Sequence, residues 1–153
     1  MSTSNVSADL VWEITRKQNA FLVQRKTAGG TQFSRDPYNL VNLQSRKYAG
    51  FVNDKAIGIA PGEKGGVTVV SKKAGSANKP ASGLISTNYS GNKSARKTYK
   101  AVANATAKNG YRADLRQVAV ARVSAIRKSQ RPVKASPERK LRGNAAKKAA
   151  ESS

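Results

Sequence analysis

The positive charge of this chain is distributed very unevenly, and the imbalance limits how much of it can form a compact fold. Residues 1–70 contain 9 Lys and Arg and 5 Asp and Glu, whereas residues 71–153 contain 20 basic and 3 acidic side chains. A compact body that concentrated the formal net charge of +21 would repel itself. We therefore expect the second half to carry surfaces that a polyanionic partner, such as a nucleic acid, neutralises.

Two residue types that dominate enzyme and metal chemistry are missing. The chain has no Cys and no His, so it lacks thiolates, the usual general base and the commonest metal ligand. The carboxylates are scattered, and only Asp9 and Glu13 lie one helical turn apart, where they suit the start of a helix. We expect a protein that is not an enzyme and that uses no cofactor, metal or small-molecule substrate.

The apolar runs are short throughout the sequence. None has the length of a signal-peptide core, and none approaches the roughly 20 residues that cross a bilayer. We therefore expect a soluble, intracellular protein with no membrane partner.

The first half of the chain predicts one short helix and several strands. Ser7 is a good N-cap, and Leu10, Val11 and Ile14 share a face, so we predict a helix over residues 8–17, with a strand as the alternative. AFLVQRK and TQFSR flank a Gly29-Gly30 turn as a hairpin. The stretches KYAGFV, KAIGIA and GVTVVSKK, separated by turn residues, complete a small, mostly antiparallel sheet.

The second half predicts a connector, two helices and a tail. Residues 74–83 are small and polar, a helix runs from Ser94 to Asn109, and a third begins at Ala113-Asp114 and must end before Pro132. The sequence beyond Pro132 has almost no large apolar residues. We predict an α+β fold, with residues 1–131 as a single globular RNA-binding domain and 132–153 as an extended, basic, low-complexity tail that is disordered until bound.

An arginine interrupts the apolar face of the third expected helix. At about 100° per residue, Arg122 falls inside the stripe formed by Leu115, Val118, Ala119, Val123 and Ile126. One interpretation is a structural arginine, either snorkelling to solvent or paired with Asp9 or Glu13 of the first helix. The other is a contact to a phosphate at the edge of the stripe. The sequence leaves both open.

The remaining basic residues of the second half group into two surfaces. Arg116 and Arg127 share one side of the third helix, and no carboxylate interrupts the track that continues past its end through Lys128, Arg131 and Lys134, which favours a phosphate-binding ledge. A second basic surface would span residues 72–100 and contain Lys72, Lys73, Lys79, Arg96, Lys97 and Lys100, with the last three near a helix N-terminus where an anion would bind. Tyr48, after Arg46 and Lys47, is a candidate for stacking on an unpaired base.

An ordered set of segments resembles one known family. SADLVW, FLVQRK, PYNL, SRKYAGF, KGGVTVV and YRADLR…VSAIRKSQRPV occur in the order found in the eukaryotic large-ribosomal-subunit protein twenty-eight family. The resemblance covers most of residues 7–134. Its most specific part is the motif SAI-x-x-SQ-x-PV at the C-terminal end of this region. It does not extend to the tail.

This resemblance implies a non-catalytic ribosomal protein with a small α+β body and basic extensions. Its partners would be large-subunit ribosomal RNA and neighbouring large-subunit ribosomal proteins, and its location the cytoplasmic ribosome after nucleolar passage during assembly. On the matching positions, the candidate RNA contacts are Arg46, Lys47, Arg112, Arg116, Arg122, Arg127 and Lys134.

Three other functions are compatible with parts of the sequence. A nucleolar large-subunit assembly factor of the maintenance-of-killer-sixteen type shares some N-terminal patterns. Its cysteines, however, would fall near Ala20, Ser34 and Gln44, and this chain has no cysteine. A DNA-compacting, chromatin-type protein would also be this basic, although with a longer tail and a simpler body. An enzyme acting on RNA would need a general base or a metal site, for which the residues are missing.

Overall fold

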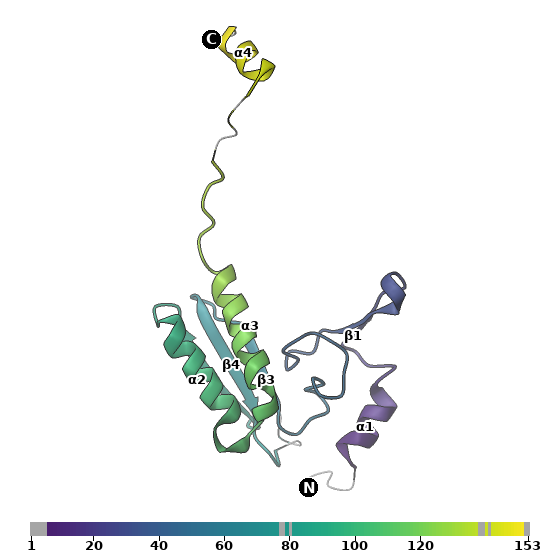
Figure 1. The fold of residues 1–153 in the computed structure, drawn as a ribbon. Helices are drawn as coiled ribbons and strands as arrows, with labels where there is room; N and C mark the ends of the chain where they lie inside the picture. Colours follow the sequence, from purple (N-terminus) through teal and green to yellow (C-terminus); the bar gives the residue numbers. More distant parts are fainter. Residues whose placement is uncertain (1–5, 77–78, 80, 138–139, 141, 152–153) are drawn as a thin grey trace.

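A three-stranded antiparallel sheet with two helices on one face forms the larger part of the molecule (Figure 1). The structure is a computed structural model, and it describes residues 6–76, 79, 81–137, 140 and 142–151. Strands β3 (Ile57–Pro61), β4 (Gly66–Lys72) and β5 (Leu84–Ser90) form this sheet, and helices α2 (Ala95–Ala107) and α3 (Arg116–Ser129) cover it. The predicted α+β class is confirmed.

The N-terminal part lies beside this sheet and contains a separate two-stranded one. Helix α1 (Ala8–Thr15) precedes strands β1 (Leu22–Gln24) and β2 (Gln32–Ser34), which pair antiparallel around a short 3₁₀ turn, η1 (Ala28–Gly30). The hairpin was predicted correctly. The single sheet was not, because β1 and β2 do not pair with β3, β4 or β5.

The expected helix at the N-terminus is present, and a cap begins it. The Ser7 Oγ accepts a hydrogen bond from the Leu10 amide at 3.2 Å, which satisfies one of the free N–H groups of the first turn. Its apolar residues are not part of the core, since Leu10 and Ile14 are 53% and 70% exposed.

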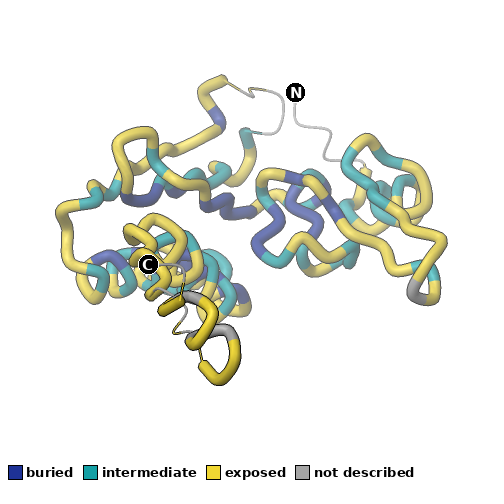
Figure 2. Tube along the Cα trace, turned by 90° about the horizontal axis from the view of Figure 1, so that it is seen from above, coloured by how far each residue is buried: buried dark blue, intermediate teal, exposed yellow. Residues whose placement is uncertain are grey.

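The core lies between the sheet and the two helices. Strands β3 and β4 pair with Ile57 opposite Ser71 and Ile59 opposite Val69. Every second residue of each strand therefore faces the helices. The buried apolar cluster consists of Leu40, Ile57, Ile59, Val67, Val69, Val102, Leu115, Ala119 and Val123. Figure 2 shows buried stretches both in the sheet with its helices and in the neighbouring N-terminal part, while most of the outer segments are exposed.

One predicted strand is wrong and one real strand was missed. Residues 47–52, KYAGFV, form turns, held by the Ala49 amide, which donates to the Ser45 carbonyl at 2.9 Å, and by the buried Asp36, whose Oδ2 accepts from the Phe51 amide at 2.9 Å. The missing strand is β5, a polar segment that pairs with β4 over its whole length.

The two helices end close to where the sequence predicts. Ser94 caps α2, accepting from the Lys97 amide at 3.4 Å, and Asn109 and Gly110 turn the chain with positive φ after it, in the 3₁₀ segment η2 (Lys108–Gly110). A second 3₁₀ turn, η3 (Ala113–Leu115), leads into α3, which ends three residues before Pro132.

The tail leads away from the body and contains one short helix. Residues 132–137 have no regular structure, whereas Asn144–Glu151 form α4 (Figure 1). This helix differs from the expected tail without structure, and the reason is local: NAAKKAAE is rich in Ala, Lys and Glu, which are strong helix formers. Within the described ranges, no helix combines the length and apolarity needed to cross a bilayer.

Candidate nucleic-acid interface

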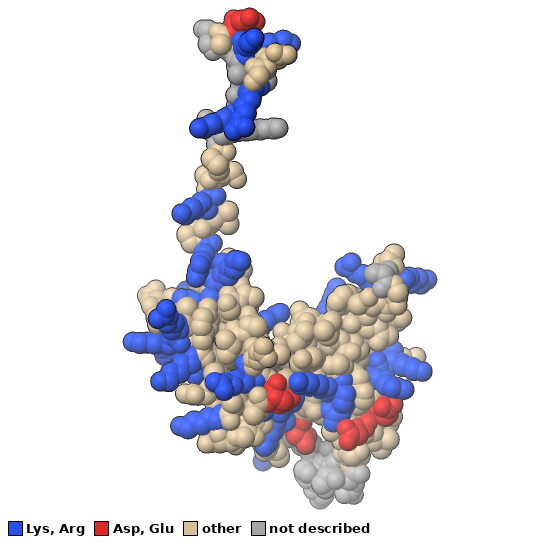
Figure 3. All heavy atoms as spheres, viewed as in Figure 1, with Lys and Arg blue, Asp and Glu red and all other residues tan. Residues whose placement is uncertain are grey.

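The clearest candidate surface runs along α3 and into the tail. Four side chains, Arg116, Lys128, Arg131 and Lys134, are exposed and make no hydrogen bond or ion pair with any described residue. We call these four the α3 ridge. Figure 3 shows basic side chains over α2, at the end of α3 and along the tail, while acidic ones occupy small areas low on the body and at the far end of the tail. A polyanion would therefore meet little opposing charge here.

Arg127 was predicted on the same basic track, but part of its guanidinium forms a hydrogen bond within the protein. Arg127 is half-buried, and its Nη2 donates to the Lys93 carbonyl at 3.2 Å. Lys93 lies in the loop between β5 and α2, so Arg127 ties α3 to that loop.

Gln130 fixes the end of α3 against the sheet, and the sequence analysis missed it. Its Oε1 accepts from the Gly66 amide at 3.0 Å, and its Nε2 donates to the Gly66 carbonyl at 2.7 Å. Gly66 has φ +86°, and a Cβ there would lie 2.1 Å from the Tyr89 carbonyl oxygen, so only glycine fits. This pair holds the α3 ridge in place.

The basic residues of the second predicted surface are divided between the two ends of the sheet. Lys73, Lys79, Arg96, Lys97 and Lys100 are all exposed, with no side-chain partner among the described residues. Lys73 and Lys79 lie at the end where β4 finishes and β5 begins, whereas α2 starts beyond the other end of β5. Arg96 and Lys97 lie in the first turn of α2, which contains no acidic residue. Cations there oppose the helix dipole, so a bound anion would relieve the conflict.

Lys72 was predicted in this surface, but its ammonium group points into the protein. The Nζ donates to the Gly50 carbonyl at 2.6 Å and lies 5.2 Å from the centre of the Tyr38 ring. Burial lowers the pKa of Lys72, and the nearby carboxylates of Asp36 and Asp54 act in the opposite direction. Lys72 therefore joins β4 to the N-terminal part.

Arg46 also has internal partners. Its Nη2 lies 2.8 Å from Asp9 Oδ1 of α1, and its Nη1 donates to Asn53 Oδ1. The neighbouring Lys47 Nζ lies 5.6 Å from the centre of the Tyr48 ring. Tyr48 is half-buried and packs against the core, which leaves less of its ring for a base than the sequence suggested. A role for these three in RNA binding stays a prediction.

Arg112 is held by four internal hydrogen bonds. It binds both carboxylate oxygens of Asp114, at 2.9 and 3.0 Å, and donates to the carbonyls of Lys55 and Lys47 at 2.8 and 3.0 Å. The hydrogen bonds from Arg112 lower the pKa of the Asp114 carboxyl. The Arg112 side chain is only 16% exposed. It therefore links the segment before α3 to the loop that precedes β3.

We expect Arg112→Ala to lower the free energy of unfolding by about 2 kcal/mol, because two carbonyls and one carboxylate lose a charged donor. Arg116→Ala removes the same side chain four residues away from an exposed position without partners, so it should change stability by less than about 0.5 kcal/mol. Urea unfolding followed by circular dichroism measures both. Equal losses in the two variants would contradict the structural role of Arg112.

Arg122 occupies the position that the helical pattern gave it, in the apolar face of α3. Its Nε is buried and has no hydrogen-bond partner. The proposed pairing with α1 is wrong, because Asp9 binds Arg46 and Glu13 binds Arg16 at 3.1 Å. Arg122 is therefore half-buried and has no hydrogen-bond or ion-pair partner among the described residues, which is compatible with both the snorkelling and the phosphate interpretation.

The chain thus belongs to a recognisable class, that of small basic α+β proteins that carry exposed Lys and Arg side chains on helices and a tail. No group of three or more His, Cys, Asp or Glu residues that could hold a metal occurs in the part of the chain that the structure describes.

Comparison with known proteins narrows this class to one family. A sequence model described as the Ribosomal L28e protein family matches residues 10–129. The large ribosomal subunit protein eL28 of Schizosaccharomyces pombe is 44% identical over 131 residues, which cover 85% of this chain and 97% of that protein. The protein of the same name from Dictyostelium discoideum is 35% identical over 91% of this chain and 100% of its own length. That from Caenorhabditis elegans is 31% identical over 82% and 91%. The chain belongs to the ribosomal L28e family, as its segments predicted.

Proposed function

We propose that this chain is a structural constituent of the large subunit of the cytosolic eukaryotic ribosome, where it binds ribosomal RNA and supports translation without catalysing a reaction. Family membership and the names of the three relatives support the ribosomal role. The main support for RNA binding is the α3 ridge, whose four cationic side chains have no partner among the described residues.

The proposed contact is mainly with phosphates. The ridge and the start of α2 present charged groups on exposed helices, which suits backbone contacts that fix the pose of the protein on the RNA. Folded ribosomal RNA is largely A-form, and its deep major groove hides the base edges, so recognition would follow RNA shape. Affinity would then fall steeply with salt.

Neighbouring large-subunit ribosomal proteins are the other proposed partners. The exposed apolar side chains Leu10 and Ile14 of α1, and Val133 at the base of the tail, offer contact area outside the basic surfaces. The proposed location is the cytoplasmic ribosome, reached after nucleolar passage during assembly. An assembly factor and a chromatin protein remain the alternatives, and the relatives' names favour neither.

The proposal is tested by the salt dependence of binding to an isolated large-subunit RNA fragment. The logarithm of the binding constant should fall linearly with the logarithm of salt concentration, with a slope that corresponds to several phosphate contacts. Stronger binding to a DNA duplex than to folded ribosomal RNA under equal salt would favour the chromatin alternative.

Replacing Arg122 by methionine should separate the two interpretations of this residue. Because the Nε is buried without a partner, Arg122→Met should leave the free energy of unfolding unchanged or raise it by about 1 kcal/mol. If the guanidinium contacts a phosphate, RNA affinity should fall about 3- to 10-fold. Thermal unfolding and RNA binding of one preparation give both values. A stability loss above about 2 kcal/mol would mean that the arginine is structural.

A further inference from the structure

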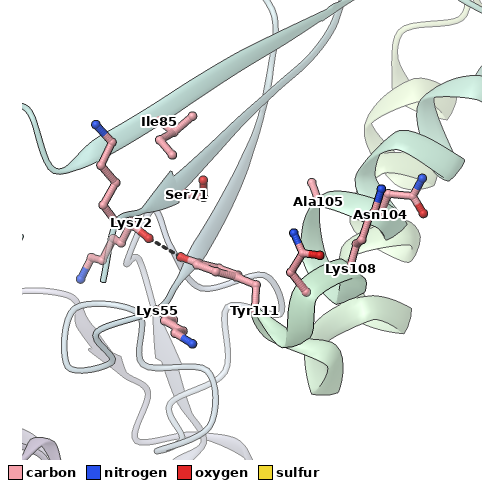
Figure 4. A pocket seen from close by; sticks show the side chains of 10 residues that line it. Lys55, Ser71, Lys72, Ile85, Asn104, Ala105, Lys108 and Tyr111 are labelled. Atoms are coloured by element: carbon pink, nitrogen blue, oxygen red, sulfur yellow. Dashed lines mark hydrogen bonds between the residues drawn. The ribbon is translucent and has the colours of Figure 1, made fainter. Parts of the chain in front are cut away.

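A cavity lined by basic residues lies outside the α3 ridge. It has a volume of about 490 Å³ and lies between the C-terminal part of α2, the turn that carries Tyr111, the end of β4 and the start of β5 (Figure 4). The side chains of Tyr111, Ile85 and Ala105 line it, together with the lysines Lys55, Lys73 and Lys108. We call this cavity the Tyr111 notch.

The notch has a rigid, partly apolar floor. The Tyr111 hydroxyl lies within hydrogen-bonding distance of the carbonyls of Ala56 and Lys72, which fixes the ring against the sheet. Ile85 pairs with Ser71 in the β4–β5 register and is 48% exposed, and the cavity lies between it and Asn104 and Ala105 of α2 (Figure 4). Tyr111 and Ile85 thus lie on either side of Ser71 in the lining (Figure 4), and a flat ring and an apolar side chain in one cavity can pack against a planar group.

The rim of the notch is cationic and carries amides. Lys55 Nζ lies 5.9 Å from the centre of the Tyr111 ring, and Lys73 and Lys108 have no side-chain partner among the described residues. No carboxylate lines the cavity, whereas the amides of Asn104 and Asn109 do. An amide offers both a donor and an acceptor, as the edge of a nucleobase requires.

We propose that the Tyr111 notch receives one unpaired nucleotide of ribosomal RNA, with its base against Tyr111 and Ile85 and its flanking phosphates beside Lys73 and Lys108. This inference rests on the proposed function and specifies one contact of a different kind. The volume lies in the range of about 300–1,000 Å³ typical of pockets for small organic groups. Unpaired RNA bases stack on aromatic side chains, whereas a duplex keeps its bases inside.

The test fills the notch without changing the charge. Ala105→Trp places an indole in the cavity from an exposed position on α2, and Ala121→Trp makes the same change at an exposed position on α3 outside the notch. Fluorescence anisotropy of a labelled oligouridylate and of a labelled RNA duplex measures binding to the full chain. We expect Ala105→Trp to weaken oligouridylate binding about 5-fold or more, since stacking of one base is worth about 1–3 kcal/mol, and to leave duplex binding within about 2-fold. Ala121→Trp should change neither.

A second pair of variants guards against a folding defect. Ile85→Asp introduces a negative charge facing the notch, and Ser86→Asp introduces the same charge at the next residue, which faces the other side of β5. Only Ile85→Asp should weaken oligouridylate binding selectively. Equal effects of Ile85→Asp and Ser86→Asp, or equal losses for oligouridylate and duplex, would overturn the notch proposal.

Three further outcomes are distinguishable. If the unmodified chain binds neither RNA probe, the proposed function itself fails. If it binds both but Ala105→Trp changes neither, only the notch proposal fails. A glutamate-rich peptide, or free uridine monophosphate, that competes as well as the oligouridylate would overturn it in favour of an acidic protein segment or a free nucleotide.

Discussion

Replacing Arg116, Lys128 and Arg131 together by alanine should lower the affinity for large-subunit ribosomal RNA about 10- to 100-fold near physiological salt. The three side chains are exposed and have no partner among the described residues. When the logarithm of the binding constant is plotted against the logarithm of the salt concentration, each phosphate contact contributes about 0.7–0.9 to the slope. The slope should therefore become shallower by about two units, while the melting temperature stays nearly constant.

The matched control removes the same charge from the other end of the molecule. Lys17, Arg25 and Lys26 are exposed, and their side chains likewise make no hydrogen bond or ion pair with any described residue. Their triple replacement by alanine should change the slope by less than one unit. If both triple variants lose affinity and slope equally, binding reflects net charge and the α3 ridge is not a specific surface.

Ile57→Ala should produce the largest loss of stability among the single substitutions considered. Ile57 is completely buried, 0% exposed, in the cluster that joins β3 to α2 and α3. Removing its side chain leaves a cavity and should lower the free energy of unfolding by about 2–5 kcal/mol. For a domain of this size, the melting temperature would fall by roughly 5–15 °C.

The same substitution at Ile14 provides the control, because Ile14 of α1 is 70% exposed. Ile14→Ala should change stability by no more than about 0.5 kcal/mol. Denaturant unfolding followed by circular dichroism compares the two variants directly. Similar losses at both positions would contradict the placement of the core between the sheet and the helices.

The helices were predictable because local residues determine where they begin and end. Ser7 and Ser94 accept hydrogen bonds from the first turns, and Pro132 lies just beyond α3. The strands depended more on distant partners. β5 reads as a polar segment and becomes a strand because it pairs with β4, whereas the apolar KYAGFV forms turns because polar groups such as Asp36 bind its backbone.

The candidate site was predictable as a set of basic surfaces, but not in its individual side chains. Charge alone could not tell Arg116, which is free, from Arg112, which binds Asp114 and two carbonyls. These carbonyls lie 57 and 65 residues away in sequence. No local pattern records such pairings, and the same holds for the contact of Gln130 with Gly66.

We propose that this chain is an integral protein of the large ribosomal subunit. Sucrose-gradient sedimentation of lysate from cells that express the tagged chain, with a high-salt wash of the fractions, tests this role most directly. We expect the chain to migrate with large subunits, monosomes and polysomes and to remain bound after the wash. Confinement to nuclear precursor particles, or pelleting with chromatin, would contradict the claim.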